Sequence, residues 1–262
     1  MGSATSQALA DARDAVAKLG TVPAALAEEL FSAGLVVGDS LQLRHALSDP
    51  EVASTEKRAL LGAIFGSKLS PAALELLDGL AAARWSRSSD LLVGIEEAGL
   101  RSAAASTEAD VSGELFGVER LVAGDAELEL ALGSKLSPVE TKVGVVERLL
   151  TGKVSPQTVA IVRHLVQQPR GRRIGELLRH AAAVTADARG FQIATVTSAA
   201  PLGEAQTTRL EQSLTAQYGR PLRINAIVDP ALVGGLRVQI GDDVIDGTIA
   251  SRLSALRQKL AG

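Results

Sequence analysis

Few residues in this sequence combine the type and the spacing that catalysis or metal binding requires. His45, His164 and His180 are not joined by an H-E-x-x-H spacing. No serine lies in a G-x-S-x-G elbow, and no cysteine is present to bind a metal or form a disulfide. The sequence therefore predicts no catalytic residue, no metal ligand and no cofactor-binding residue. The histidines are predicted at the surface or at the boundary of the core.

Two charged clusters could hold an ion, but each has a simpler explanation. Asp242, Asp243 and Asp246 lie in a predicted hairpin and just before a predicted helix, where aspartate favours turns and N-caps. The arginines of the segment QQPRGRR (167–173) could contact a phosphate. A solvated loop is the favoured interpretation of this segment, and contact with an acidic partner helix is the alternative.

The composition indicates a helical protein that does not cross a membrane by itself. Aliphatic residues and alanine dominate, and Trp85 and Tyr218 are each the only residue of their kind. The net charge of −3 argues against direct nucleic-acid binding. No uncharged apolar run approaches the ~18–20 residues that span a bilayer, and the first residues lack a secretory pattern. Any membrane association is therefore expected to come through a partner.

From residue 5 to about residue 189 the apolar residues recur at helical spacing, and the pattern repeats with an offset of 85 residues. Both copies contain a serine N-cap followed by a proline, which favours a helix start. Ser137-Pro138 with Glu140 also has the form of a capping box. The matched pairs include Glu29-Leu30-Phe31 with Glu114-Leu115-Phe116, Lys57 with Lys142, Lys68 with Lys153, Ser70-Pro71 with Ser155-Pro156, and Leu80 with Leu165.

This repetition predicts a duplicated helical bundle. The first copy is assigned to residues 1–105 and the second to residues 106–190. At the same offset, the last helix of the first copy aligns with the first helix of the chain. We therefore expect the helix over residues 88–105 to belong to both bundles, which would make a continuous rod.

Residues 191–262 have a different pattern, which predicts a small α+β domain of βαββα type. A strand over 191–197 precedes a helix over 204–218, in which Leu210, Leu214 and Tyr218 share one face. A second strand covers 222–228, a third begins after Gly234-Gly235, and the chain turns back into Val244-Ile245. The glycine pair predicts positive φ or close backbone approach. Ile249, Leu253, Leu256 and Leu260 predict a closing helix.

This C-terminal segment closely resembles that of the delta subunit of F-type ATP synthases, also known as the oligomycin-sensitivity-conferring protein. The matching runs are VTSA with PL, YG, VDPALVGGLRV, and VIDGT. The signature residues that we take as structural are Pro201, Leu202, Gly219, Asp229, Pro230, Gly234, Gly235, Gly241, Asp246 and Gly247. The extra helical copy resembles the elongated delta subunits of actinobacteria, although no fused b-type membrane helix is evident, so separate b subunits are expected.

The resemblance implies a non-catalytic stator, or peripheral-stalk, subunit at the cytoplasmic face of the cell membrane. It implies that the helical part binds N-terminal segments of alpha subunits and that the C-terminal domain binds the b subunits. Such a subunit stops the catalytic head from rotating with the rotor. The alternative is a generic helical-repeat adaptor unrelated to ATP synthase. An enzyme with a dispersed site has little support, because no nucleophile is paired with a base.

Overall fold

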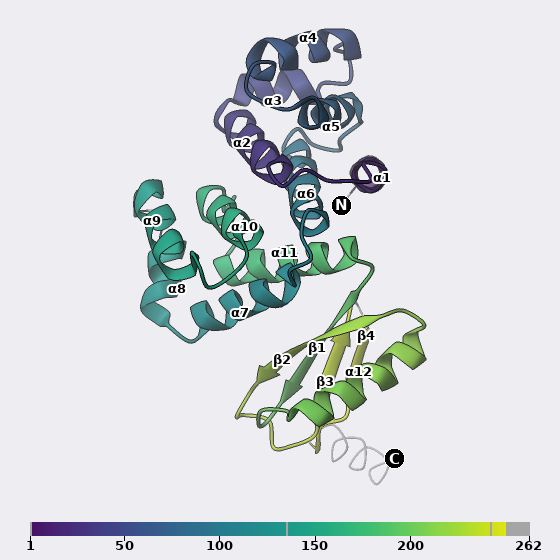
Figure 1. Cartoon of the computed structure of the whole chain (residues 1–262), viewed down its shortest axis with the longest axis vertical. Coiled ribbons are helices and arrows are strands. Elements are labelled where there is room, and N and C mark those ends of the chain that lie inside the picture. The colour runs from purple at the N-terminus through teal and green to yellow at the C-terminus, as the bar shows by residue number, and fades with distance from the viewer. Residues whose placement is uncertain (1, 135, 242, 250–262) are drawn as a thin grey trace, which may run out of the picture. The chain divides into compact units, whose positions relative to one another are not determined.

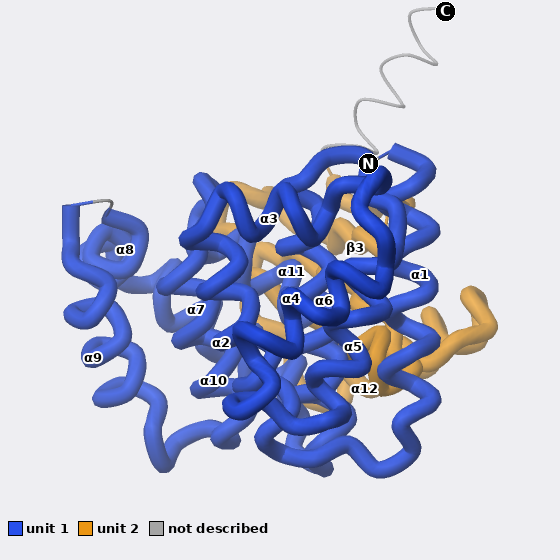
Figure 2. Tube along the Cα trace, turned by 90° about the horizontal axis from the view of Figure 1, so that it is seen from above, with its two compact units in different colours: residues 1–185 blue, residues 186–262 orange. Residues whose placement is uncertain are grey.

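A computed structural model of the chain describes residues 2–134, 136–241 and 243–249. The chain divides into two compact units, residues 1–185 and residues 186–262, shown in blue and orange in Figure 2. The first unit is helical, and the second contains a four-stranded sheet. The predicted fold class, mainly α with a small α+β C-terminal domain, is confirmed.

The helices of the first unit form two series that follow each other at the predicted offset. The first series is α1 (Ser3–Ala17), α2 (Leu26–Asp39), α3 (Leu41–Ser48), α4 (Ser54–Phe65), α5 (Pro71–Ala82) and α6 (Asp90–Ala105). The second is α7 (Val111–Ala123), α8 (Ala126–Gly133), α9 (Val139–Leu150), α10 (Pro156–Gln167) and α11 (Ile174–Ala188). Figure 1 shows the order of these helices along the chain.

Local signals explain several of the helix starts. The hydroxyl of Ser70 accepts a hydrogen bond from the Ala73 N–H at 3.3 Å, and Ser155 accepts one from Thr158 at the same distance. The capping box predicted at Ser137 is wrong. Pro138 is itself the N-cap residue of α9 and has an extended backbone, so the helix starts one residue later and has no side-chain cap.

The two series share a tertiary bond as well as a sequence pattern. In the first, the Glu29 carboxylate accepts hydrogen bonds from the Ser70 N–H at 3.0 Å and from its hydroxyl at 2.5 Å. In the second, Glu114 accepts the same two bonds from Ser155, at 3.1 and 2.5 Å. Each glutamate thus ties one helix to the start of another across the bundle, and the duplication extends to three-dimensional contacts.

Helix α6 is the central helix of the first unit. Nearly all of its residues are buried, from Leu91 to Ala104. It packs against α1, α2 and α5 of the first series and against α10 of the second, and in Figure 1 it lies between the two groups. A helix buried on all sides belongs to a core rather than to a linker.

The second unit is a mixed sheet with one helix. Its elements are β1 (Gln192–Ser198), α12 (Glu204–Tyr218), β2 (Leu222–Val228), β3 (Leu236–Ile240) and β4 (Asp243–Asp246). The strand order is β2-β1-β3-β4, with β1 parallel to β2 and the other pairs antiparallel. The predicted turn back into Val244-Ile245 corresponds to the fourth strand, which covers Asp243–Asp246.

The core of the second unit lies between the sheet and α12. Val196 and Val238 are paired across β1 and β3, and both pack with Leu214 of the helix. Leu210 and Tyr218 pack against the same cluster, as their spacing predicted. Of the predicted closing helix, Leu253, Leu256 and Leu260 lie outside the described residues.

Candidate partner-binding site

The signature residues of the C-terminal segment lie at the turns and ends of its elements. Pro201 and Leu202 lie between β1 and α12, Gly219 ends α12, Asp229 and Pro230 follow β2, Gly234 and Gly235 precede β3, Gly241 joins β3 to β4, and Asp246 and Gly247 end β4. Such positions fix the path of the backbone. Their assignment as a structural signature stays a prediction.

The glycine pair before β3 has the backbone conformation that was predicted. Gly234 has a φ of 140° and Gly235 a φ of 86°. A side chain at Gly235 would also overlap the carbonyl oxygen of Gly247, because the two backbones approach closely there. Only glycine satisfies both conditions without strain.

Asp246 and Asp229 accept backbone hydrogen bonds within turns, which agrees with the turn roles expected of them. Asp246 accepts a hydrogen bond from the Thr248 N–H at 3.0 Å. The hydrogen bonds from the side chain and the backbone of Thr248 hold the pKa of Asp246 below its usual value. Asp229 accepts a similar bond from the Ala231 N–H at 2.9 Å. Asp242 lies outside the described residues.

The histidine prediction is wrong for His164. This residue on α10 is only 2% exposed, and its ring stacks on Phe31 of α2 with a centroid distance of 4.4 Å. His164 follows the helical apolar pattern of α10, and its ring provides an aromatic face to a neighbouring helix. His45 is exposed at the surface and His180 is half-buried, which agrees with the surface or boundary positions predicted for them.

A buried ionic cluster joins the two helical series around Glu96 of α6, which is 1% exposed. Its carboxylate pairs with Arg170 and, at 2.9 Å, with Arg172, both from the loop between α10 and α11. His164 Nε2 lies 3.4 Å from the same carboxylate. We call these four residues the Glu96 cluster.

The electrostatics of the cluster favour its ionised form. Burial alone would raise the pKa of Glu96, but the contact with His164 and the charges of the two arginines outweigh burial and lower it to about 2. Burial also lowers the pKa of the nearby His180 on α11. The carboxylate therefore stays charged over the whole physiological range.

The cluster corrects the favoured interpretation of the segment QQPRGRR. Its Arg170 and Arg172 do not belong to a solvated loop, because they contact an acidic helix, and that helix is α6 of the same chain. Sequence reasoning missed Glu96 itself. The available signal was a glutamate that follows the apolar run Leu91–Ile95 inside a predicted helix, since a buried carboxylate requires a cationic partner.

Helix α2 packs across both α6 and α10. The ring of Phe31 fills the space beside Gly99 of α6, where any larger residue would overlap it. The Gln168 side chain, just after α10, donates to the carbonyl oxygen of Gly34 at 2.9 Å. Arg163 of α10 pairs with Glu28 of α2 at 3.1 Å. An amphipathic helix thus covers the surface formed by α6 and α10.

The corresponding surface of the first series is open. Helices α1 and α5 align with α6 and α10 at the repeat offset, and between them lies a groove with a volume of about 880 Å³. Its walls carry Ala12 and Ala15 from α1, Leu19 just after α1, and Gly79 from α5, and charged residues also line it. We call it the α1–α5 groove. Walls made of small and apolar residues favour the binding of a helix over that of a small-molecule substrate.

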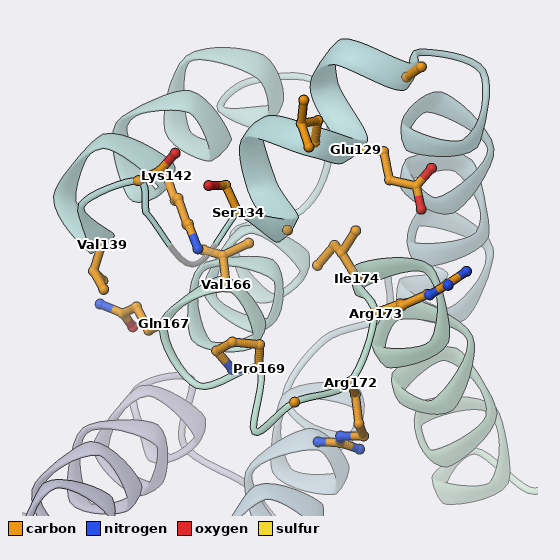
Figure 3. Close-up of a pocket in the computed structure, with 15 residues that line it drawn as sticks. Glu129, Ser134, Val139, Lys142, Val166, Gln167, Pro169, Arg172, Arg173 and Ile174 are labelled. Carbon is orange, nitrogen blue, oxygen red and sulfur yellow. The ribbon is translucent and has the colours of Figure 1, made fainter.

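A second opening lies in the other series. A cavity of about 690 Å³ is lined by residues of α8, the start of α9 and the segment before α11 (Figure 3). We call it the α8–α11 cavity. In the part of the chain that the structure describes, no three His, Asp or Glu side chains gather as a metal site would require. No helix among the described residues has both the length and the apolarity to cross a membrane.

Comparison with known proteins identifies the family. The family model for the ATP synthase delta (OSCP) subunit matches residues 97–260. The chain is 52% identical to ATP synthase subunit delta of Leifsonia xyli over the full length of both proteins, and 39% identical to that of Streptomyces griseus, again over both full lengths. Among solved structures, a chain in the cryo-EM structure of the Toxoplasma gondii mitochondrial ATP synthase hexamer matches 63% of this chain and 97% of its own length, with a TM-score of 0.39 and 21% identity. The chain thus belongs to the ATP synthase delta (OSCP) subunit family.

Proposed function

We propose that this chain is a non-catalytic stator subunit of an F-type ATP synthase. It connects the catalytic head to the peripheral stalk at the cytoplasmic face of the cell membrane, and it is held there by its partners. The observation that supports this most strongly is the 52% identity, over the full length, to an ATP synthase subunit delta. The same observation favours the stator over a generic helical-repeat adaptor.

The task of a stator is to resist torque, which demands contact area and stiffness rather than a reactive group. Two features of the first unit support this role. Helix α6 belongs to the packing of both series, and the buried Glu96 cluster connects it to the loop before α11. We therefore propose residues 1–105 and 106–190 as two bundles that share the helix over 88–105 and act as one stiff body.

The N-terminal segments of alpha subunits are proposed to bind the α1–α5 groove. This proposal is supported by a comparison of the two helical series. The surface between α6 and α10, which corresponds to the α1–α5 groove, is covered by the amphipathic helix α2. A helix of the same kind fits the open groove between α1 and α5. The first helical copy is therefore the one that presents a vacant helix-binding surface to the head.

The second unit is proposed to bind the b subunits. Its described surface exposes several aliphatic side chains, including Val228 and Val233 near the turn after β2 and Val244 and Ile245 on β4. These side chains lie at both edges of the sheet and before β3, where they are available to an apolar surface of a partner. A stable contact of this kind buries roughly 800 Å² on each partner.

The test of the head contact is a titration of the full chain with a synthetic peptide of the alpha subunit N-terminus from the same organism. The key variant is Gly79→Gln, because a side chain at Gly79 meets no atom within 4 Å and projects into the groove. Replacing a helical glycine raises helix stability by about 0.5–1 kcal/mol, so folding is preserved. We expect the variant to weaken peptide binding at least tenfold.

The matched control is Gly62→Gln on α4. Gly62 is also helical and also has open space around its Cα, but it does not line the groove. The control should bind the peptide as the wild type does. Equal binding by the groove variant would place the alpha segment elsewhere on the chain, and no binding to the wild-type chain would remove the support for the head contact.

A further inference from the structure

The two helical series differ in the packing of their third helices, α3 and α8. In the first, α3 packs against both α2 and α5. In the second, α8 packs against α7, and the α8–α11 cavity lies between α8 and the segment Pro169–Ile174. The helices of the two series match in order, so this difference in packing arises from the residues of the second copy.

The cavity exposes apolar side chains that the rest of the fold does not use. Leu130 of α8 is 72% exposed and Val139 of α9 is 41% exposed, and both line the cavity. Leu136, in the connection between these helices, is 96% exposed. The buried leucine of α8 is Leu132 instead. Clustered exposed aliphatic side chains around a cavity mark a binding surface for another protein segment.

The charged residues that line the cavity are mainly positive. Lys142 of α9 lines it but is only 6% exposed, and Figure 3 shows its side chain directed toward Val166. Arg172 also lines it but is paired with Glu96, whereas Arg173, before α11, is exposed. The first residues of α9 and α11, Val139 and Ile174, also line it, and helix N-termini favour negative charge. Glu129 is the acidic residue among those lining the cavity.

We propose that the α8–α11 cavity docks an acidic amphipathic helix of a partner protein. Leucine-type side chains of that helix pack on Leu130 and Val139, and its carboxylates face Arg173 and the N-termini of α9 and α11. The apolar lining is too extensive for a small anion alone. The residues 250–262 of this chain have the wrong charge, since they contain Arg252, Arg257 and Lys259 but no acidic residue.

The test uses the full chain and two synthetic 16-residue helical peptides with identical leucine positions. One peptide has glutamate at all flanking positions and the other has lysine, and binding is followed by fluorescence anisotropy. We expect the wild-type chain to bind the glutamate peptide at least about tenfold more tightly than the lysine peptide. Leu130→Asp should abolish this binding, and Arg173→Glu should reverse the preference.

The matched control is Arg87→Glu. Arg87 is exposed in the corresponding loop of the first series, so this variant has the same charge change outside the cavity. It should bind both peptides as the wild type does. Equal affinity for the two peptides, binding that survives Leu130→Asp, or a response of the control equal to that of Arg173→Glu would each overturn the proposal.

Sedimentation velocity of the chain alone tests whether a second copy of the chain occupies the cavity. Self-association that Leu130→Asp removes would mean that a second copy occupies the cavity, and this would overturn the proposal. The assay contains no other ATP synthase subunit, so its result does not depend on the proposed stator role. Failure of the stator role and failure of this inference are therefore distinguishable.

Discussion

Replacing the buried carboxylate of Glu96 with an amide should weaken the first unit strongly. In Glu96→Gln the side chain keeps its shape but loses its charge, so Arg170 and Arg172 lose their buried counter-ion. The pKa of Glu96 falls from 4.5 to about 2 in the folded chain. Each factor of ten corresponds to ~1.4 kcal/mol, so the ionised group contributes about 3 kcal/mol to the free energy of unfolding.

The contribution of ionised Glu96 to the free energy of unfolding depends on pH. The folded pKa lies below the unfolded one, so the contribution is fully present above about pH 4.5 and is lost as the pH falls toward 2. At pH 7 the variant should melt about 6–12 °C below the wild type. By pH 3 the difference in free energy should shrink to about 1 kcal/mol.

The assay is thermal and urea unfolding of the full chain and the variant, followed by helical circular dichroism at several pH values. The control is Asp11→Asn, since Asp11 occupies the matching position on α1 and is exposed. It should change stability by less than about 0.5 kcal/mol. A variant as stable as the wild type at pH 7, or a loss that is unchanged at low pH, would refute the electrostatic reasoning.

Three further variants test other parts of the structure. Gly235→Ala should destabilise the second unit, because the added methyl group overlaps the Gly247 carbonyl oxygen and the residue has a positive φ. Hydrogen exchange of the β3 amides measures the loss of stability, and unchanged protection of these amides would contradict the prediction. Phe31→Ala should cost about 3–5 kcal/mol by leaving a void against His164, measured by urea unfolding; a loss below about 1 kcal/mol would show that α2 repacks. Burial lowers the pKa of His180, so the neutral form is favoured by folding, and stability should fall as the pH drops below about 6.5. His180→Gln should reduce that fall, and an unchanged pH profile would exclude this histidine as its source.

The features predicted correctly from the sequence are those fixed by local chemistry. The serine caps at Ser70 and Ser155 need only the adjacent proline and backbone to form. The turn glycines Gly234 and Gly235 likewise depend on backbone sterics within a few residues. The repeat offset then orders these local signals into two matching series of helices.

The features that were missed depend on contacts between distant residues. Gln168 bonds to the backbone of Gly34 across 134 residues, and Arg172 reaches Glu96 across 76. Periodicity shows that a helix has an apolar face but does not identify its neighbour. A buried charge is visible in the sequence only as an exception to the apolar pattern, and its partner is decided by the packing of the whole bundle.

The most direct test of the central claim is an affinity purification of the tagged full chain from detergent-solubilised membranes of its own organism, with the partners identified by mass. The stator account predicts recovery of alpha, beta and b subunits in constant ratio, with less alpha and beta recovered for Gly79→Gln than for Gly62→Gln. Recovery of none of these subunits, from a chain shown by circular dichroism to be folded, would contradict the account.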